Sequence, residues 1–299
     1  MVDYDPKGWV SIVFQLRGSV LVTLWPRICF VAATGACAAY LFEHYGFKIP
    51  PITHTMVGVA LGLLLVFRTN ASFDRWWEGR KQLGALVNRS RDLVRQVASY
   101  VEGDDARTTE ARVNVRRLVC AFYGLLRQHL RAERDLAALG SLLSQADRAD
   151  LEPVKNRPVV MASWITAELV SLARQGKLTE DRLRAMDGNL TAFHDCLGAC
   201  ERILRTPVPF AYAQHIKSFL LLFTFSAPFA IVEAMRWYTP IAAGVLAYAM
   251  FGIEEIGVEI EDPFGYDPND LPLDTIGSGI ELTTAEILNM GTSITRRDR

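Results

Sequence analysis

Long apolar runs with sharply segregated polar stretches define the pattern of this chain. The run from Ile52 to Phe67, ITHTMVGVALGLLLVF, contains no Asp, Glu, Lys or Arg, and the stretch RTNASFDRWWEGRK follows it without a proline. Because no helix breaker separates the two, the pattern predicts one long helix that leaves a membrane and continues into water. Val59, Leu63 and Phe67 are spaced i, i+4 and i+8 and form an apolar stripe along that helix.

Three other apolar runs accompany this helix. Residues 18–42 are long enough to span a bilayer, and Pro26 beside the single charge at Arg27 predicts a broken or kinked helix. Residues 218–232 and 237–253 fall short of the roughly 20 apolar residues of a lone span. Short spans are tolerated when other subunits cover the helix ends, so the pattern predicts four spans in an oligomer.

The distribution of basic residues sets the expected orientation. The turn at 43–51 has one Lys and one Glu, whereas seven basic residues lie between Arg68 and Arg95. The positive-inside rule then places residues 68 onward in the cytoplasm. With four spans, both termini are cytoplasmic in a multi-pass protein of the inner (plasma) membrane, and the polar start of the chain shows no signal peptide.

The middle of the chain has the pattern of a helical bundle. Apolar residues recur at helical spacing in LVNRSRDLVRQVASYV and VRRLVCAFYGLLRQHL, and Gly103, Gly140 and residues 153–158 supply breaks. No strand-like alternation persists. Residues 271–299 are expected to form an extended, peripheral tail. The expected fold class is an all-α membrane protein with four transmembrane helices and a cytosolic helical bundle.

Composition and motifs exclude several function classes. Lys+Arg 32 against Asp+Glu 33 gives a net charge of -1, so nucleic acid is not an expected partner. The chain has no nucleophile elbow, HExxH or P-loop, which argues against an enzyme. The five cysteines have no paired zinc spacing, so small buried residues are the favoured interpretation over a metal site. They are Cys29, Cys37, Cys120, Cys196 and Cys200.

Two separate motifs resemble those of the bestrophin family of ion channels. They are FRTNASFDRWWEGR at 67–80 and IEDPFGYDPND at 260–270, each beside an apolar run and in the family's order. The resemblance covers roughly residues 10 to 275. It implies a homopentamer in a lipid bilayer that conducts monovalent ions passively through an axial pore.

The resemblance and the pattern together divide the chain into five segments. Residues 1–17 form a cytosolic N-terminal segment and residues 18–67 hold transmembrane helices 1 and 2. Residues 68–205 form the cytosolic helical domain. Residues 206–253 hold an aperture segment with transmembrane helices 3 and 4, and residues 254–299 form a cytosolic acidic segment with the C-terminal tail.

The resemblance implies two constrictions in the pore. Val59, Leu63 and Phe67 match the apolar residues of the narrow neck, a gate that resists ions by dewetting. Val208, between Pro207 and Pro209, matches an apolar residue that forms a cytosolic aperture. The alternatives are lipid-facing or core packing for the stripe and a plain helix-breaking linker for the prolines.

Polar residues that continue the stripe bear on ion selectivity. If the stripe faces an axis, a ring of carboxylates below it favours cations, and short bacterial-type members of the family are associated with cation conduction. Sodium is therefore the expected ion, chloride is the alternative, and a membrane-anchored scaffold or sensor is the alternative of another class. A solvated face with ion pairs to Arg75, Arg80 or Lys81 also explains the pattern. The continuing residues are Asn70, Asp74 and Glu78.

The acidic segment resembles the calcium clasp of the family. Carboxylates at short spacing on a turn suit calcium, which takes six to eight oxygen ligands. Two matched positions carry Glu and Asp in place of the family's amides, and the acidic run is thinner. An acidic cap against a neighbouring subunit's Arg or Lys is the alternative, and no other cofactor is expected. The matched positions are Glu259, Asp262, Asp267 and Asp270.

Overall fold

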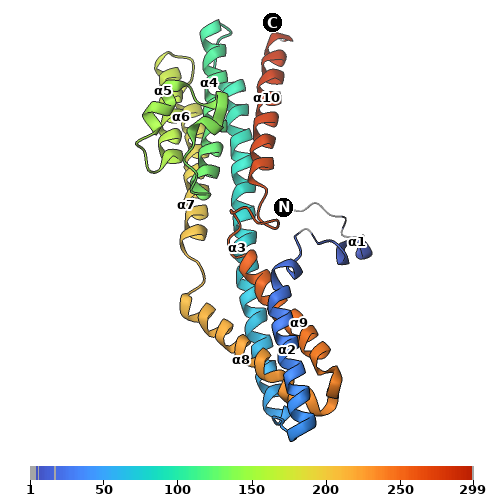
Figure 1. Ribbon diagram of the computed structural model, residues 1–299. Helices are drawn as coiled ribbons and strands as arrows, with labels where there is room; N and C mark the ends of the chain where they lie inside the picture. The colour runs from blue at the N-terminus through green and yellow to red at the C-terminus, as the bar shows by residue number, and fades with distance from the viewer. Residues whose placement is uncertain (1–4, 6, 17, 298–299) are drawn as a thin grey trace. The chain divides into compact units, whose positions relative to one another are not determined.

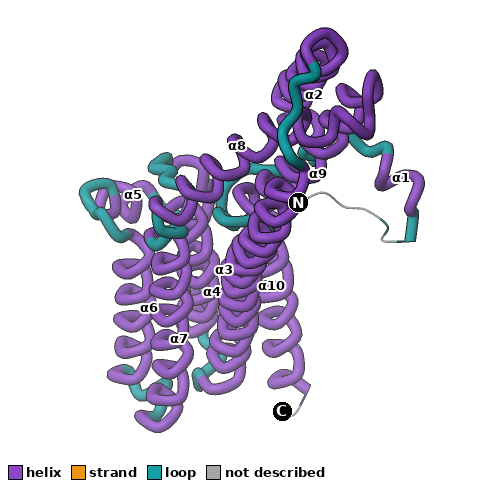
Figure 2. Tube along the Cα trace, turned by 90° about the horizontal axis from the view of Figure 1, so that it is seen from below, coloured by secondary structure: helices purple, strands orange, loops and turns teal. Residues whose placement is uncertain are grey.

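The computed structural model describes residues 5, 7–16 and 18–297, and the regular secondary structure of these residues is helical (Figures 1 and 2). Among them there is no strand, which confirms the all-α expectation. The chain forms two compact units, residues 1–77 with 206–270 and residues 78–205 with 271–299. The predicted N-terminal segment 1–17 contains the short helix α1 (Trp9–Val13) and lies partly outside the described residues.

The predicted long helix is confirmed. Helix α3 (Pro51–Tyr100) runs for 50 residues without interruption, a length of roughly 75 Å at 1.5 Å per residue. Its residues up to Trp77 belong to the first unit and its later residues to the second.

The first unit consists mainly of four helices. They are α2 (Leu21–Tyr45), the first half of α3, α8 (Phe210–Met235) and α9 (Thr239–Glu259), with the short turn η2 (Arg236–Tyr238) before α9. Each runs antiparallel to the one before it in this order, and α2 runs parallel to α8, against which it also packs through Phe30 and Phe225 (Figure 1). His54 of α3 bonds to Ser226 of α8 at 2.8 Å, which sets the register of that pair. Their shared core consists of apolar side chains, including Leu24, Val31, Leu61, Leu65, Ile216, Leu220 and Ala247.

Three stretches of the described residues are long and apolar enough to cross a membrane: Leu21–Tyr45, Pro51–Tyr100 and Phe210–Glu259. The last comprises α8 and α9. Although the uncharged runs inside these two helices are short, α9 has 21 residues and extends over roughly 31 Å. The hydrocarbon core of a bilayer is about 30 Å thick, so the helix itself is long enough.

Of the two outcomes predicted at Pro26, a break does not occur, and a kink stays a prediction. Helix α2 is continuous from Leu21 to Tyr45 with Pro26 inside it. Pro26 is the sixth residue of α2, and its missing N–H removes the one bond that the Val22 carbonyl would accept. Packing against neighbouring helices holds the rest of the helix, as it does around Pro228 inside α8.

The second unit is a helical bundle. Helices α4 (Ala106–Leu130), α6 (Arg157–Arg174), α7 (Glu180–Arg205) and α10 (Leu273–Arg297) join the second half of α3. The shorter η1 (Leu136–Leu142) and α5 (Gln145–Leu151) connect α4 to α6. The predicted breaks at Gly103, Gly140 and residues 153–158 are confirmed. Phe122 and Phe193, with ring centroids 4.9 Å apart, pack at the centre of this bundle.

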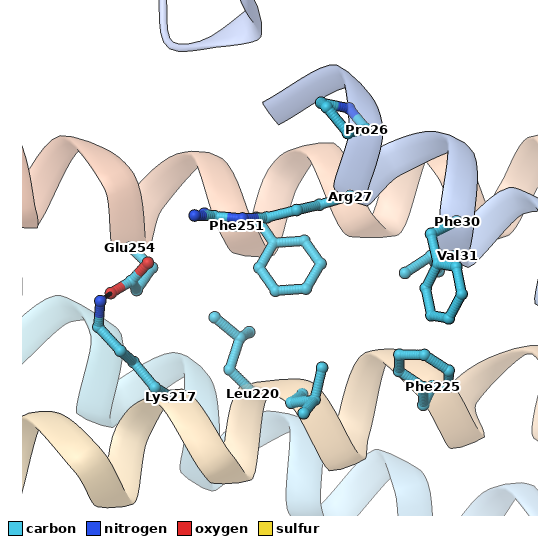
Figure 3. Close-up of a pocket in the computed structure, with 10 residues that line it drawn as sticks. Pro26, Arg27, Phe30, Val31, Lys217, Leu220, Phe225, Phe251 and Glu254 are labelled. Atoms are coloured by element: carbon cyan, nitrogen blue, oxygen red, sulfur yellow. Dashed lines mark ion pairs between the residues drawn. The ribbon is translucent and has the colours of Figure 1, made fainter. Parts of the chain in front are cut away.

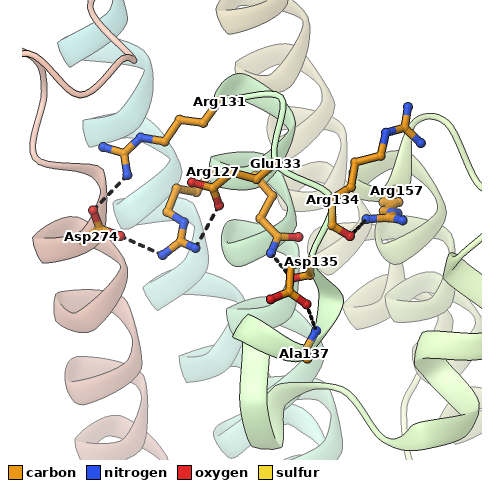
Figure 4. Close-up of polar contacts among 9 residues, drawn as sticks. Arg127, Arg131, Glu133, Arg134, Asp135, Ala137, Arg157 and Asp274 are labelled. Carbon is orange, nitrogen blue, oxygen red and sulfur yellow. Dashed lines mark hydrogen bonds and ion pairs between the residues drawn. The ribbon is translucent and has the colours of Figure 1, made fainter.

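The prediction of an extended tail is wrong, because residues 273–297 form α10. Tyr123 donates a hydrogen bond to the Leu273 carbonyl at 2.8 Å. A Cβ at Gly277 would lie 2.9 Å from the Tyr123 ring, so α10 packs closely on α4 there. Arg127 and Arg131 hold Asp274 at 2.7 and 2.9 Å (Figure 4).

Candidate functional site

The apolar stripe of α3 lies outside the chain's own core. Val59, Leu63 and Phe67 are 65%, 56% and 63% exposed, whereas Leu61 and Leu65 on another face of the helix are buried. The alternative that the stripe packs in the core of its own subunit is therefore excluded. Its side chains need cover from lipid or from other copies of the chain.

The two glycines beside the stripe have different surroundings. A Cβ at Gly58 would lie 3.1 Å from the Phe223 ring, so Gly58 lets α8 approach α3 closely. A Cβ at Gly62 would meet nothing within 4 Å. Gly62 therefore has space for a neighbour that does not come from this chain.

The polar residues after the stripe differ in how their charge is balanced. Asn70 and Asp74 are exposed, and Asp74 forms no ion pair among the described residues. Glu78 accepts a hydrogen bond from Arg202 at 2.6 Å, rather than pairing with a basic residue of its own helix. The charge of Glu78 is therefore partly offset by a partner that the sequence pattern did not indicate.

A buried arginine follows the stripe directly. Arg68 is 2% exposed, and its Nη2 lies 3.4 Å from Glu261 Oε2 and 3.9 Å from Glu254 Oε1. Glu254 is also buried and lies 3.4 Å from Lys217 Nζ. A buried charge is costly unless it is paired, so these side chains depend on one another. The sequence pattern had indicated only a cytoplasmic positive charge at Arg68.

Glu261 connects α3 to the proline segment. Its Oε1 accepts the Val208 N–H at 3.0 Å while its Oε2 pairs with Arg68. Arg75, two turns further along α3, donates to the Glu261 carbonyl at 3.2 Å and to the Thr206 carbonyl. Val208 is half-buried between its two prolines. One carboxylate thus holds together the helix that carries the stripe and the residue expected at the aperture.

The acidic segment after α9 is bound to the same unit. Trp76 donates to the Asn269 carbonyl at 3.2 Å, and the Asn269 amide donates to Glu259 at 3.0 Å. Asp270 is 3% exposed, and its Oδ2 accepts the Asp267 N–H at 2.7 Å. Burial, followed by repulsion from nearby carboxylates, raises the pKa of Asp270 to about 6.

The four residues of the expected calcium clasp are not arranged as a ligand set. Within the described ranges, no three carboxylate, imidazole or thiolate side chains converge as a metal ion requires. Glu259 is engaged by Asn269, and Asp270 is buried with its Oδ1 unpartnered. In this arrangement the segment does not fit calcium, and calcium binding stays a prediction from sequence.

The cysteines divide into two groups. Cys120, Cys196 and Cys200 are buried, and burial raises the pKa of Cys200 to about 12. Cys29 and Cys37 are exposed on α2. The interpretation as small buried residues therefore fits the three cysteines of the second unit.

A cavity of about 440 Å³ opens between α2, α8 and α9 in the first unit. Figure 3 shows Phe251 between an aromatic end, with Phe30 and Phe225, and a polar end. At the polar end Lys217 points toward Glu254. Among the described lining residues Glu254 is the only carboxylate and is already engaged by cations, so the cavity has no free general base for an active site.

The sequence of the chain matches a known family along nearly its whole length. The family model described as bacterial/fungal bestrophin protein matches residues 1–286. The chain belongs to the bestrophin family. Members of this family are ion channels, so the expectation that this bestrophin is not an enzyme is confirmed.

Relatives of this bestrophin carry a common description. A voltage-dependent anion channel-forming protein of Nostoc sp. is 40% identical over 296 residues, covering 98% of this chain and 95% of that protein. A protein of the same description from Escherichia coli strain K12 is 31% identical over 289 residues, covering 94% of this chain and 92% of the relative.

Solved structures share the fold. A point mutant of a bacterial bestrophin homologue from Klebsiella pneumoniae has a TM-score of 0.80 at 26% identity, covering 88% of this chain and 99% of the other. A second crystal structure, described as a point mutant of a membrane protein, reaches a TM-score of 0.84 at 26% identity, covering 89% and 98%. This bestrophin therefore has the fold of these membrane proteins over most of its length.

Proposed function

We propose that this bestrophin is one subunit of a pentameric channel that conducts anions passively, with Val59, Leu63 and Phe67 as its hydrophobic neck. The observation that carries the proposal is that all three side chains are more than half exposed on a face turned away from the chain's own core. A symmetric assembly that turns this face to its axis covers the apolar side chains and narrows the pore. Such a constriction blocks ions by dewetting until it widens.

The first unit supports four membrane spans per subunit. Helices α2, α8 and α9 and the first half of α3 are each long enough to cross the hydrocarbon core. Four crossings leave the N-terminal segment and α10 on the same side of the membrane. The basic residues after Phe67 favour the cytoplasmic side of the inner membrane for both.

The sign of the conducted ion is proposed from two observations. The relatives are named as anion channel-forming proteins, which favours the chloride alternative over the sodium expectation. The case for sodium rested on the carboxylates of Asp74 and Glu78, and the charge of Glu78 is offset by Arg202. Of these two described carboxylates, Asp74 alone then remains unpaired. We therefore place anion selectivity first and sodium selectivity second.

The test is the reversal potential of the purified protein in a planar bilayer under a sodium chloride gradient. A potential near the chloride equilibrium value supports the proposal. A potential near the sodium value restores the cation prediction, and Asp74→Asn should then shift it toward zero. No current from a correctly assembled protein overturns conduction and favours the membrane-anchored scaffold.

A further inference from the structure

A basic pocket in the second unit is separate from the neck and the proline segment. It has a volume of about 320 Å³ and lies between the end of α4 and the start of α6. Its lining contains four basic side chains and one carboxylate. Pockets of this size accommodate small metabolites.

The basic side chains of the pocket are only partly neutralised by nearby acids. Arg157 lies 3.7 Å from Glu152, and Arg205 lies 3.5 Å from Glu201. Arg134 and Lys155 form no ion pair with any described residue, and no dashed line reaches the Arg134 guanidinium in Figure 4. The lining carboxylate Glu133 pairs with Arg127 at 3.3 Å. Behind the pocket, Glu201 is engaged by His129 at 2.7 Å and by other donors. The pocket therefore keeps an excess of positive charge.

The start of α6 adds to this preference for an anion. Arg157 and Pro158, its first two residues, line the pocket. The N-cap residue Asn156 makes no side-chain cap bond: its Nδ2 donates to Glu201 at 3.0 Å, and its Oδ1 is buried without a partner among the described residues. The first-turn N–H groups of this 18-residue helix thus lack the usual side-chain acceptor. The N-terminus of a helix favours phosphate and other anions.

A buried hydrogen-bond acceptor of the lining residue Gln128 lacks a donor in the described part of the chain. Gln128 is 2% exposed, and its Nε2 donates to the Asp135 carbonyl at 2.6 Å. Its Oε1 is buried and has no hydrogen-bond partner among the described residues. An unpaired buried acceptor is costly, and a ligand that supplies a hydroxyl donor removes that cost.

We propose that this pocket binds a small phosphate monoester that carries hydroxyl groups. Arg134, Lys155 and Arg205 contact the phosphate together with the N-terminus of α6. A ligand hydroxyl donates to Gln128 Oε1 after a small shift of this side chain opens the atom, which is closed to water, to the pocket. Guanidinium and ammonium groups suit a phosphate dianion, because several charge-assisted hydrogen bonds form at once.

The test uses isothermal titration of the full chain in detergent, in a phosphate-free buffer, with three probes. Glycerol 3-phosphate should bind saturably, one per chain. Inorganic phosphate should bind about tenfold more weakly, because it has no hydroxyl remote from the phosphate that reaches Gln128 while the phosphate oxygens contact the cations. Uncharged glycerol should not bind. Equal binding of the two phosphates contradicts the hydroxyl contact, and no binding of either overturns the site.

A pair of double variants distinguishes binding in this pocket from non-specific attraction of the ligand to positive charge. The double variant Arg134→Ala/Lys155→Ala should weaken glycerol 3-phosphate binding at least tenfold. The control Lys81→Ala/Arg174→Ala removes the same charge from exposed positions of the same unit and should leave binding unchanged. Equal losses in both double variants would show non-specific attraction and refute the site.

Discussion

The buried pair between Arg68 and Glu261 permits a quantitative prediction. Arg68→Met removes a guanidinium that is 2% exposed and leaves Glu261 without its cation. Removing one partner of a buried pair costs about 3–5 kcal/mol. Since the Glu261 side chain is 18% exposed, water screens part of the loss, and we expect about 3 kcal/mol.

Glu261→Gln tests the pair from the other side. The amide oxygen still accepts the Val208 N–H, but the charge that Arg68 requires is gone. Glu254, 3.9 Å from Arg68, is then the carboxylate in this cluster that still balances the Arg68 charge. We expect a smaller loss of about 2 kcal/mol. If the two side chains interact, the double variant loses less unfolding free energy than the sum of the two single losses, by about 1 kcal/mol or more.

The measurement is thermal unfolding of the detergent-solubilised protein at a fixed scan rate. A loss of about 3 kcal/mol corresponds to a fall in Tm of about 6–12 °C for a chain of this size class. Lys81→Met, an exposed cation on the same helix, serves as the control and should change stability by less than about 0.5 kcal/mol. Additive losses, or an Arg68 variant as stable as the control, would refute the argument.

Three further predictions concern the neck, the acidic segment and the helix packing. Leu63→Ala with Phe67→Ala should raise single-channel conductance in planar bilayers, and unchanged current from an assembled double variant contradicts the neck. Because the folded-state pKa of Asp270 is raised to about 6 from 3.8, its ionisation opposes folding, so stability falls by roughly 2–3 kcal/mol between pH 4 and 6 and is flat above. Asp270→Asn should remove that slope in Tm measured against pH, and an unchanged slope assigns it to other groups. Gly35→Ala should lower Tm, because its Cβ would lie 2.8 Å from the Pro240 backbone. Gly244→Ala should leave Tm unchanged, because its Cβ would make an ordinary contact at 3.7 Å. Equal Tm values for the two variants would contradict the packing argument.

The elements that depend on local pattern could be predicted from the sequence. Helix α3 needs only the absence of breakers from residue 52 onward, and the segment at Pro207 and Pro209 needs only the missing N–H groups. The break expected at Pro26 does not occur because one missing hydrogen bond does not end a helix that neighbouring helices pack against, and the same holds at Pro228 in α8.

Helix α10 was missed because its buried face is weakly apolar. The face includes a glycine against Tyr123 and a fully buried threonine whose hydroxyl bonds to the Ile280 carbonyl at 2.7 Å. Small and hydroxylated residues weaken the hydrophobic periodicity on which the prediction depends. The inward positions are Leu273, Gly277, Ile280, Thr284 and Leu288.

The charged part of the candidate site could not be found from local pattern. Arg68 and Glu261 are 193 residues apart in the sequence, and each by itself has the pattern of a solvated cytoplasmic charge. Only the folded first unit shows that Arg68 is buried beside Glu254. Similarly, the partner of Glu78 comes from α7, far from the helical neighbours that sequence spacing suggests.

The bridge through Glu261 has a consequence for how the stripe is held. Phe67 and Arg68 are adjacent on an unbroken helix, so the buried pair that fixes Arg68 also fixes the end of the apolar stripe. The same carboxylate holds the Val208 N–H, and Arg75 holds the Thr206 carbonyl. Glu261 and Arg75 therefore anchor the stripe and the proline segment to one another, and neither can shift far without breaking one of these hydrogen bonds. A neck that gates by a small change in width requires this kind of stiff backing, because loosely held side chains would sample wide and narrow diameters alike.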